Sequence, residues 1–138
     1  MELCNMFTKE QFEGMSLAMA TPEITVEKSN TAAAGYRVKL RVHFRCRNFT
    51  FLQNLQAHLI ENDIDSLLKE SEGNHRPYPL LRISKPENLR AFLSLMPDMP
   101  DANERFDCFK QVLSLYEKGS HMTQKGLDKV LEIKGYML

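Results

Sequence analysis

The segment Tyr36-Arg37-Val38-Lys39-Leu40-Arg41-Val42-His43-Phe44-Arg45-Cys46-Arg47 alternates strictly between apolar side chains and basic side chains or histidine. Successive side chains of a β-strand point to opposite faces, so this pattern predicts a strand with one face in a core. The other face then presents a single file of basic groups. We call this set the basic row: Arg37, Lys39, Arg41, His43, Arg45 and Arg47.

Neighbouring members of the basic row would lie about 6 to 7 Å apart along the strand. Such a file suits the phosphates of a nucleic acid, and arginine also reads guanine edges in the major groove of duplex DNA. We therefore expect all six residues to bind double-stranded DNA. The alternative is a solvated sheet face whose charge is offset by nearby acids, and it stays open; the candidate acids are Glu23, Glu27, Glu70 and Glu72.

Composition sets limits on the rest of the molecule. The chain has 138 residues, of which 43% are hydrophobic and 26% charged, and this predicts one globular domain spanning residues 1–138. Lysine plus arginine equals aspartate plus glutamate at 18 each, so any nucleic-acid partner must be held by a local patch. Three unpaired cysteines and the lack of a long apolar stretch predict an intracellular protein, cytoplasmic or organellar, without a membrane partner.

The remaining elements can be predicted outward from this strand. Thr8 and Gln11 form a capping-box pattern before the first helix, which Pro22 should terminate. Pro86 suits the first turn of a later helix, and Thr123 can cap the last one. The predicted order is α+β: helix Lys9–Ala20, strand Glu23–Lys28, strand Tyr36–Arg47, helix Thr50–Glu61, strands Asp65–Glu70 and Tyr78–Ser84, a helix from Pro86, and helices Ala102–Lys118 and Gln124–Tyr136.

Residue spacing alone predicts no catalytic or metal site. The four histidines are scattered, and none pairs with cysteine or a carboxylate at the spacing of a zinc site. Motifs typical of common hydrolases, nucleotide-binding proteins and dehydrogenases are missing from the sequence. Asp63 and Asp65 lie beside a predicted helix end, where capping or solvated acids are commoner than Mg²⁺ ligands.

The order of elements and several local segments resemble the LAGLIDADG homing endonuclease family, in its single-motif homodimeric form. The segments that carry this resemblance are Phe12–Ala20, Tyr36–Arg41, Leu81–Ser84 and His121–Leu127. The resemblance implies an αββαββα core with a curved antiparallel four-stranded sheet, followed here by two extra C-terminal helices. It also implies double-stranded DNA as a partner.

The signature of that family is degenerate in this chain. The resemblance places Met19 and Leu17 where the family has acids, and neither side chain can bind Mg²⁺, which takes oxygen ligands. We therefore expect no catalytic residue, no cofactor and impaired cleavage. In the alternative, Glu23 replaces the missing acid, and the protein is an active Mg²⁺-dependent endonuclease. A protein-interaction module that reuses the fold is a further alternative.

The resemblance also implies a second copy of the chain. In the family two signature helices pack together through small residues, and Gly14 and Ala18 keep that spacing. We therefore expect a homodimer whose interface contains Gly14, Met15 and Ala18. In the alternative, Gly14 and Ala18 pack against the sheet of their own chain.

Overall fold

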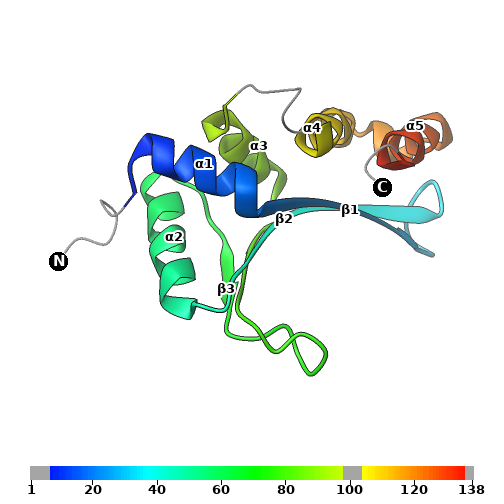
Figure 1. Cartoon of the computed structure of the whole chain (residues 1–138). Coiled ribbons are helices and arrows are strands. Elements are labelled where there is room, and N and C mark those ends of the chain that lie inside the picture. Colours follow the sequence, from blue (N-terminus) through cyan, green and yellow to red (C-terminus); the bar gives the residue numbers. More distant parts are fainter. Residues whose placement is uncertain (1–6, 98–103, 136–138) are drawn as a thin grey trace. The chain divides into compact units, whose positions relative to one another are not determined.

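The computed structural model describes residues 7–97 and 104–135. Helices and strands alternate as the sequence predicts, and two helices follow the core (Figure 1). The elements are α1 (Lys9–Met19), β1 (Ala20–Lys28), β2 (Tyr36–Arg45), α2 (Phe49–Glu61), β3 (Leu67–Lys69), β4 (Leu80–Ile83), α3 (Pro86–Leu95), α4 (Glu104–Glu117), η3 (Ser120–Met122) and α5 (Gln124–Gly135).

The chain divides into two compact units, and β1 and β2 contribute residues to both. The first unit comprises Met1–Thr21 and Arg41–Pro97, and the second comprises Pro22–Leu40 and Asp98–Leu138. The prediction of one domain over the whole chain stays a prediction.

The four strands form one sheet in the order β1-β2-β4-β3. In the first unit, β4 pairs antiparallel with both β2 and β3, and His43 lies opposite Arg82. The α+β class with a four-stranded antiparallel sheet is thereby confirmed.

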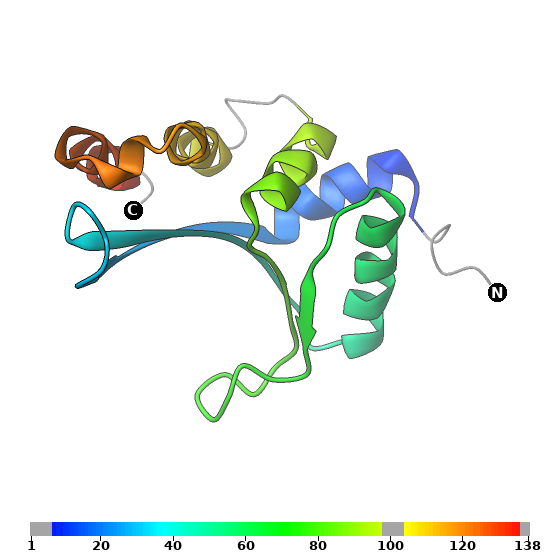
Figure 2. The same cartoon turned by 180° about the vertical axis from the view of Figure 1, so that it is seen from behind.

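The core of the first unit joins strands to helices through aromatic contacts. The Phe92 ring of α3 meets Phe44 of β2 at 5.7 Å and Phe12 of α1 at 6.2 Å between ring centroids, both edge to face. Helix α2, which lies alongside β3 in Figure 2, adds Leu52, Leu55 and Leu59, all fully buried. Burial of these apolar side chains positions the outward face of β2 and β4.

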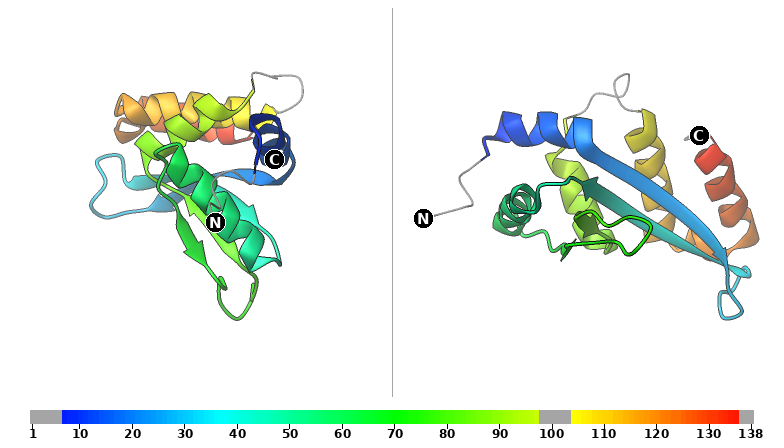
Figure 3. Two further views of the ribbon diagram at one scale, coloured as in Figure 1. Left: turned by 90° about the vertical axis from the view of Figure 1, so that its left-hand side faces the viewer. Right: turned by 60° about the horizontal axis from the view of Figure 1, so that its bottom comes forward.

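The core of the second unit contains residues from the first half of β2 and from helices α4 and α5. Val38 and Leu40 of β2 are buried, as the alternation predicts. Helices α4 and α5 lie side by side (Figure 3, right) and bury apolar residues along one face each. These residues are Phe106, Phe109, Val112 and Leu113 on α4, and Leu127, Val130 and Ile133 on α5.

Predicted helix caps are confirmed at both ends of the chain. The Gln11 amide donates to Thr8 Oγ1 at 3.1 Å, and the Thr8 amide donates to Gln11 Oε1 at 2.9 Å, which completes the capping box. The Gly126 amide donates to Thr123 Oγ1 at 3.0 Å. Pro86 occupies the first turn of α3.

Several predicted boundaries are wrong. Strand β1 begins at Ala20, and Pro22 lies buried inside it, which is tolerated because β1 is an edge strand and need not donate at every residue. Helix α2 begins at Phe49 because Asn48 caps it. Strands β3 and β4 are shorter than predicted, since residues 70–79 form a loop. Within this loop the Glu72 amide donates a hydrogen bond to the Arg76 carbonyl. The predicted helix ends at Ala102 and Tyr136 lie outside the described residues.

Candidate nucleic-acid interface

The part of the basic row in the first unit follows the predicted alternation. Val42 and Phe44 are fully buried, whereas Arg41 and Arg45 are half-buried and Arg47 is exposed. The side chains of Arg41 and Arg45 therefore lie on the face of β2 opposite the core, and Arg47 follows the end of the strand.

His43 departs from this pattern, because it is only 2% exposed. Its Nε2 accepts a hydrogen bond from Arg82 Nε at 3.1 Å, and its Nδ1 lies 3.4 Å from Arg45 Nη2. His43 thus lies beside Arg45 and Arg82, as a member of the basic row should, but its imidazole is buried. His43 is positioned to orient those arginines.

Sequence reasoning missed Arg82 as a member of this surface. Arg82 is half-buried on β4, directly opposite His43. The available signal was its place between the buried residues Leu81 and Ile83. A strand of four residues is too short for that alternation to stand out.

An acid from the β3–β4 loop neutralises part of the basic row. Arg45 Nε donates to Glu72 Oε2 at 2.9 Å and Arg45 Nη2 donates to Oε1 at 3.3 Å, while Arg76 Nη1 lies 4.0 Å from Oε1. The hydrogen bond from Arg45 is the main cause that lowers the pKa of Glu72; nearby positive charge adds to it and burial opposes it. At Arg45 the positive charge of this sheet face is therefore offset by an acid, as the alternative interpretation predicts.

The same loop also contacts the end of the row. The guanidinium of Arg47 lies over the ring of Tyr78, 4.9 Å from the centroid, which is cation–π geometry. Two residues of the loop 70–79 thus contact the basic row. Glu72 forms an ion pair with Arg45, and the ring of Tyr78 lies under the guanidinium of Arg47. Figure 2 shows this loop extending beyond β3 and β4 in green.

The part of the row in the second unit is more open. Arg37 is exposed, and Lys39 Nζ lies 3.1 Å from Glu27 Oε2. The side chains of that pair are 31% and 49% exposed, so water and salt screen it and it contributes about 1 kcal/mol or less. Within residues 7–97 and 104–135, Arg37, Arg41 and Arg47 form no ion pair.

Helix α1 exposes the small residues that the sequence assigns to an interface. Gly14 and Ala18 are exposed, and a Cβ added to Gly14 would meet no described atom within 4 Å. Met15 is half-buried. Because Phe12 and Ser16 form the buried side of α1, the alternative in which Gly14 and Ala18 pack against their own sheet is wrong.

The residues near the end of α1 do not suit a divalent metal ion. Met19 and Leu17 offer no oxygen ligand. Glu23 is half-buried on β1, where its Oε1 accepts from Thr25 Oγ1 at 3.3 Å. Among the residues that the structure describes, no group of three or more histidines, cysteines and acids could hold a metal.

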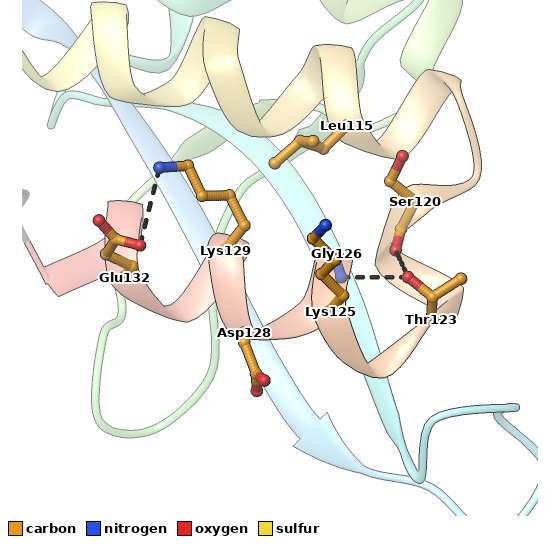
Figure 4. A pocket seen from close by; sticks show the side chains of 8 residues that line it. All are labelled: Leu115, Ser120, Thr123, Lys125, Gly126, Asp128, Lys129 and Glu132. Atoms are coloured by element: carbon orange, nitrogen blue, oxygen red, sulfur yellow. Dashed lines mark hydrogen bonds and ion pairs between the residues drawn. The ribbon is translucent and has the colours of Figure 1, made fainter.

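A second candidate site is a pocket of about 480 Å³ between α4 and α5 (Figure 4). Leu115 faces it from α4, while α5 supplies side chains of both charges, of which Lys129 and Glu132 pair at 3.6 Å. The residues that line it include no histidine and no cysteine.

Comparison with known proteins identifies the fold. It is the LAGLIDADG homing endonuclease fold, and solved structures of that class superpose on nearly the whole chain. The homing endonuclease I-TnaI has a TM-score of 0.80 and 22% identity, with 95% of this chain and 88% of that chain covered. The archaeal intron-encoded homing endonuclease I-Vdi141I, complexed with DNA, has a TM-score of 0.80 and 15% identity, with 94% and 80% covered.

Some similar structures are longer than this chain. The LAGLIDADG meganuclease I-CpaMI, bound to uncleaved DNA, has a TM-score of 0.79 and 21% identity, and 93% of this chain covers only 43% of that one. No protein-family model and no curated protein matches the sequence. The likeness therefore establishes the fold. In the described part of the chain, no helix has the length and hydrophobicity to span a membrane.

Proposed function

We propose that this protein is a homodimeric double-stranded DNA-binding protein of the LAGLIDADG homing endonuclease type whose cleavage is impaired. One observation carries the proposal: the outward face of β2 and β4 and the adjoining loop gather cationic side chains while the whole chain has no net charge. These side chains are Arg41, Arg45, Arg47, Arg76 and Arg82. DNA-bound structures with the same fold support DNA as the ligand.

Two features support the finer parts of the proposal. The open face of α1 at Gly14 and Ala18 lets the backbone of a second helix approach closely. The chain also spans less than half of I-CpaMI but most of I-TnaI, as expected if two copies do here what one longer chain does there. Impaired cleavage follows from Met19 and Leu17, since metal-assisted phosphodiester hydrolysis needs oxygen ligands for the ions.

DNA binding is tested by fluorescence anisotropy with a mixed-sequence duplex at several salt concentrations. Each phosphate contact contributes about 0.9 to the slope of log K against log salt, so wild type should show a slope of several units. Arg41→Gln should reduce that slope by about one contact. Arg105→Gln, which removes an exposed cation from α4, is the matched control. A flat salt response of the wild type contradicts the proposal.

The same duplex separates binding from cleavage. We expect binding to persist in EDTA and no strand scission of a randomised duplex library in Mg²⁺ or Mn²⁺. Scission that Glu23→Ala abolishes would instead establish the active endonuclease with a displaced acid. Binding to no nucleic acid at any salt concentration would favour the protein-interaction module.

A further inference from the structure

Arg45 forms the better shielded of the two ion pairs that the described residues make with the basic row. Two of its nitrogens donate to the two oxygens of Glu72, a bidentate arrangement that is stronger and more directional than a single ion pair. The side chains of Arg45 and Glu72 are 33% and 14% exposed, compared with 31% and 49% for Lys39 and Glu27. Water therefore competes less for the Arg45–Glu72 pair.

The position of Glu72 is set by the loop that carries it. The Glu72 amide donates to the Arg76 carbonyl at 3.0 Å, and the Gly73 amide donates to Ser71 Oγ at 3.1 Å. Gly73 has φ of +120°, a conformation that other residues rarely adopt. These bonds fold residues 71–76 into a turn that presents the carboxylate to Arg45.

We propose that Glu72 competes with DNA for Arg45 and is thereby a specificity-determining residue of the DNA-binding surface. This inference rests on the proposed function. In a non-specific complex the duplex offers scattered phosphates, and Arg45 stays with the carboxylate. In a complex with the right site, acceptors placed for a bidentate contact, such as the O6 and N7 of guanine, replace the carboxylate.

The proposal predicts that removing the Glu72 charge strengthens both kinds of complex, because the right complex no longer has to break the Arg45–Glu72 pair and the wrong ones gain a phosphate contact from Arg45. Glu72→Gln should bind a mixed-sequence duplex about tenfold more tightly at low salt, with a salt slope steeper by about 0.9, because Arg45 becomes one more phosphate contact. Affinity for a duplex selected from a randomised library by the wild type should rise by more than this, because breaking the Arg45–Glu72 pair costs more than a phosphate contact returns. The ratio of specific to non-specific affinity therefore rises.

Two further variants make the test specific to the pair. Glu70→Gln makes the same charge change at an exposed acid two residues away that has no ion pair among the described residues, and it should stay within twofold of wild type. The double variant Arg45→Gln/Glu72→Gln removes an electrically neutral pair and should restore the wild-type slope. It also keeps the proposal testable if Glu72→Gln alone fails to fold, which thermal denaturation would reveal.

The outcomes separate this inference from the proposed function. Equal gains from Glu72→Gln and Glu70→Gln would overturn the inference alone, as would a double variant that keeps the steeper slope. Failure of the wild type to bind any duplex at low salt would overturn the proposed function and this inference with it. A gain confined to Glu72→Gln, with a raised specificity ratio, supports the competition.

Discussion

Gly126 shows how a single residue can be required by packing. It lies in the first turns of α5, where glycine ordinarily destabilises a helix. A Cβ at this position would overlap the carbonyl group of Ser120, which is backbone and cannot move aside (Figure 4). Close approach of α5 to η3 therefore requires glycine here.

We predict that Gly126→Ala lowers the free energy of unfolding by about 3 kcal/mol, because the overlap forces α5 away from η3. Urea denaturation measures the change. Gly135→Ala is the matched control, since a Cβ on Gly135 would meet no described atom within 4 Å. Equal stability of the two variants would show that α5 shifts at no cost.

His121 is expected to make stability depend on pH. Its ring stacks on Tyr116 at 4.1 Å between centroids, and its buried Nδ1 has no hydrogen-bond partner among the described residues. Burial lowers the pKa of His121 below its ordinary value, although the nearby backbone of Leu115 partly opposes this. In the window just below pH 6.5 the unfolded chain therefore binds more protons than the folded one, so stability falls as pH falls through the folded pKa.

We predict that His121→Phe makes the free energy of unfolding less sensitive to pH in this window, because phenylalanine keeps the stack and does not titrate. Urea denaturation of both proteins at about pH 7.5 and pH 5 compares the two slopes, on either side of the ordinary histidine pKa. The wild type should lose more stability between these values. Identical losses would mean that His121 has the same pKa folded and unfolded.

At the scale of elements, helix α5 depends on a cap that also joins it to η3. Thr123 Oγ1 accepts from the Gly126 amide at 3.0 Å and donates to the Ser120 carbonyl at 2.8 Å. One hydroxyl thus forms hydrogen bonds with the backbone of both η3 and α5.

We predict that Thr123→Ala costs about 1 to 2 kcal/mol of unfolding free energy, because both bonds are lost. Thr123→Ser keeps the hydroxyl and should cost less than half as much. Thermal denaturation of the three proteins measures the order. A serine variant as unstable as alanine would assign the effect to the lost methyl group instead of the cap.

At the scale of the whole molecule, the proposed homodimer depends on the exposed face of α1. Gly14→Leu with Ala18→Leu fills the space that a second helix would need, while Phe12 and Ser16 keep the buried side of α1 unchanged. We predict that this double variant remains folded and is monomeric in sedimentation-velocity experiments. Lys9→Leu, at another exposed position of α1, should leave the dimer intact.

A wild-type monomer at micromolar concentration would contradict the dimer and leave the fold untouched. A variant that still dimerises would place the interface elsewhere. DNA affinity measured on the same samples should fall with dimerisation, because two linked basic surfaces bind one duplex more tightly than one surface does.

Local patterns in the sequence were sufficient to predict the type and order of the described helices and strands other than η3. Alternation identified β2, and the capping residues Thr8 and Thr123 placed the start of α1 and of α5, because periodicity and helix capping act over a few residues. The sequence also shows that the side chains of Met19 and Leu17 lack oxygen, whatever the fold. Strand ends were less predictable, since they depend on pairing: Pro22 is accommodated only because β1 is an edge strand.

The surroundings of the basic row were decided by the tertiary structure. Arg82 and Glu72 lie 39 and 27 residues along the chain from their partners His43 and Arg45, and they meet them only through the pairing of β4 with β2 and the fold of the loop. Sequence alone determined that this protein carries a strand with a basic face. Which of those cations are covered, paired or open depended on strand register and loop closure, since both arise from contacts between distant residues that no local pattern specifies.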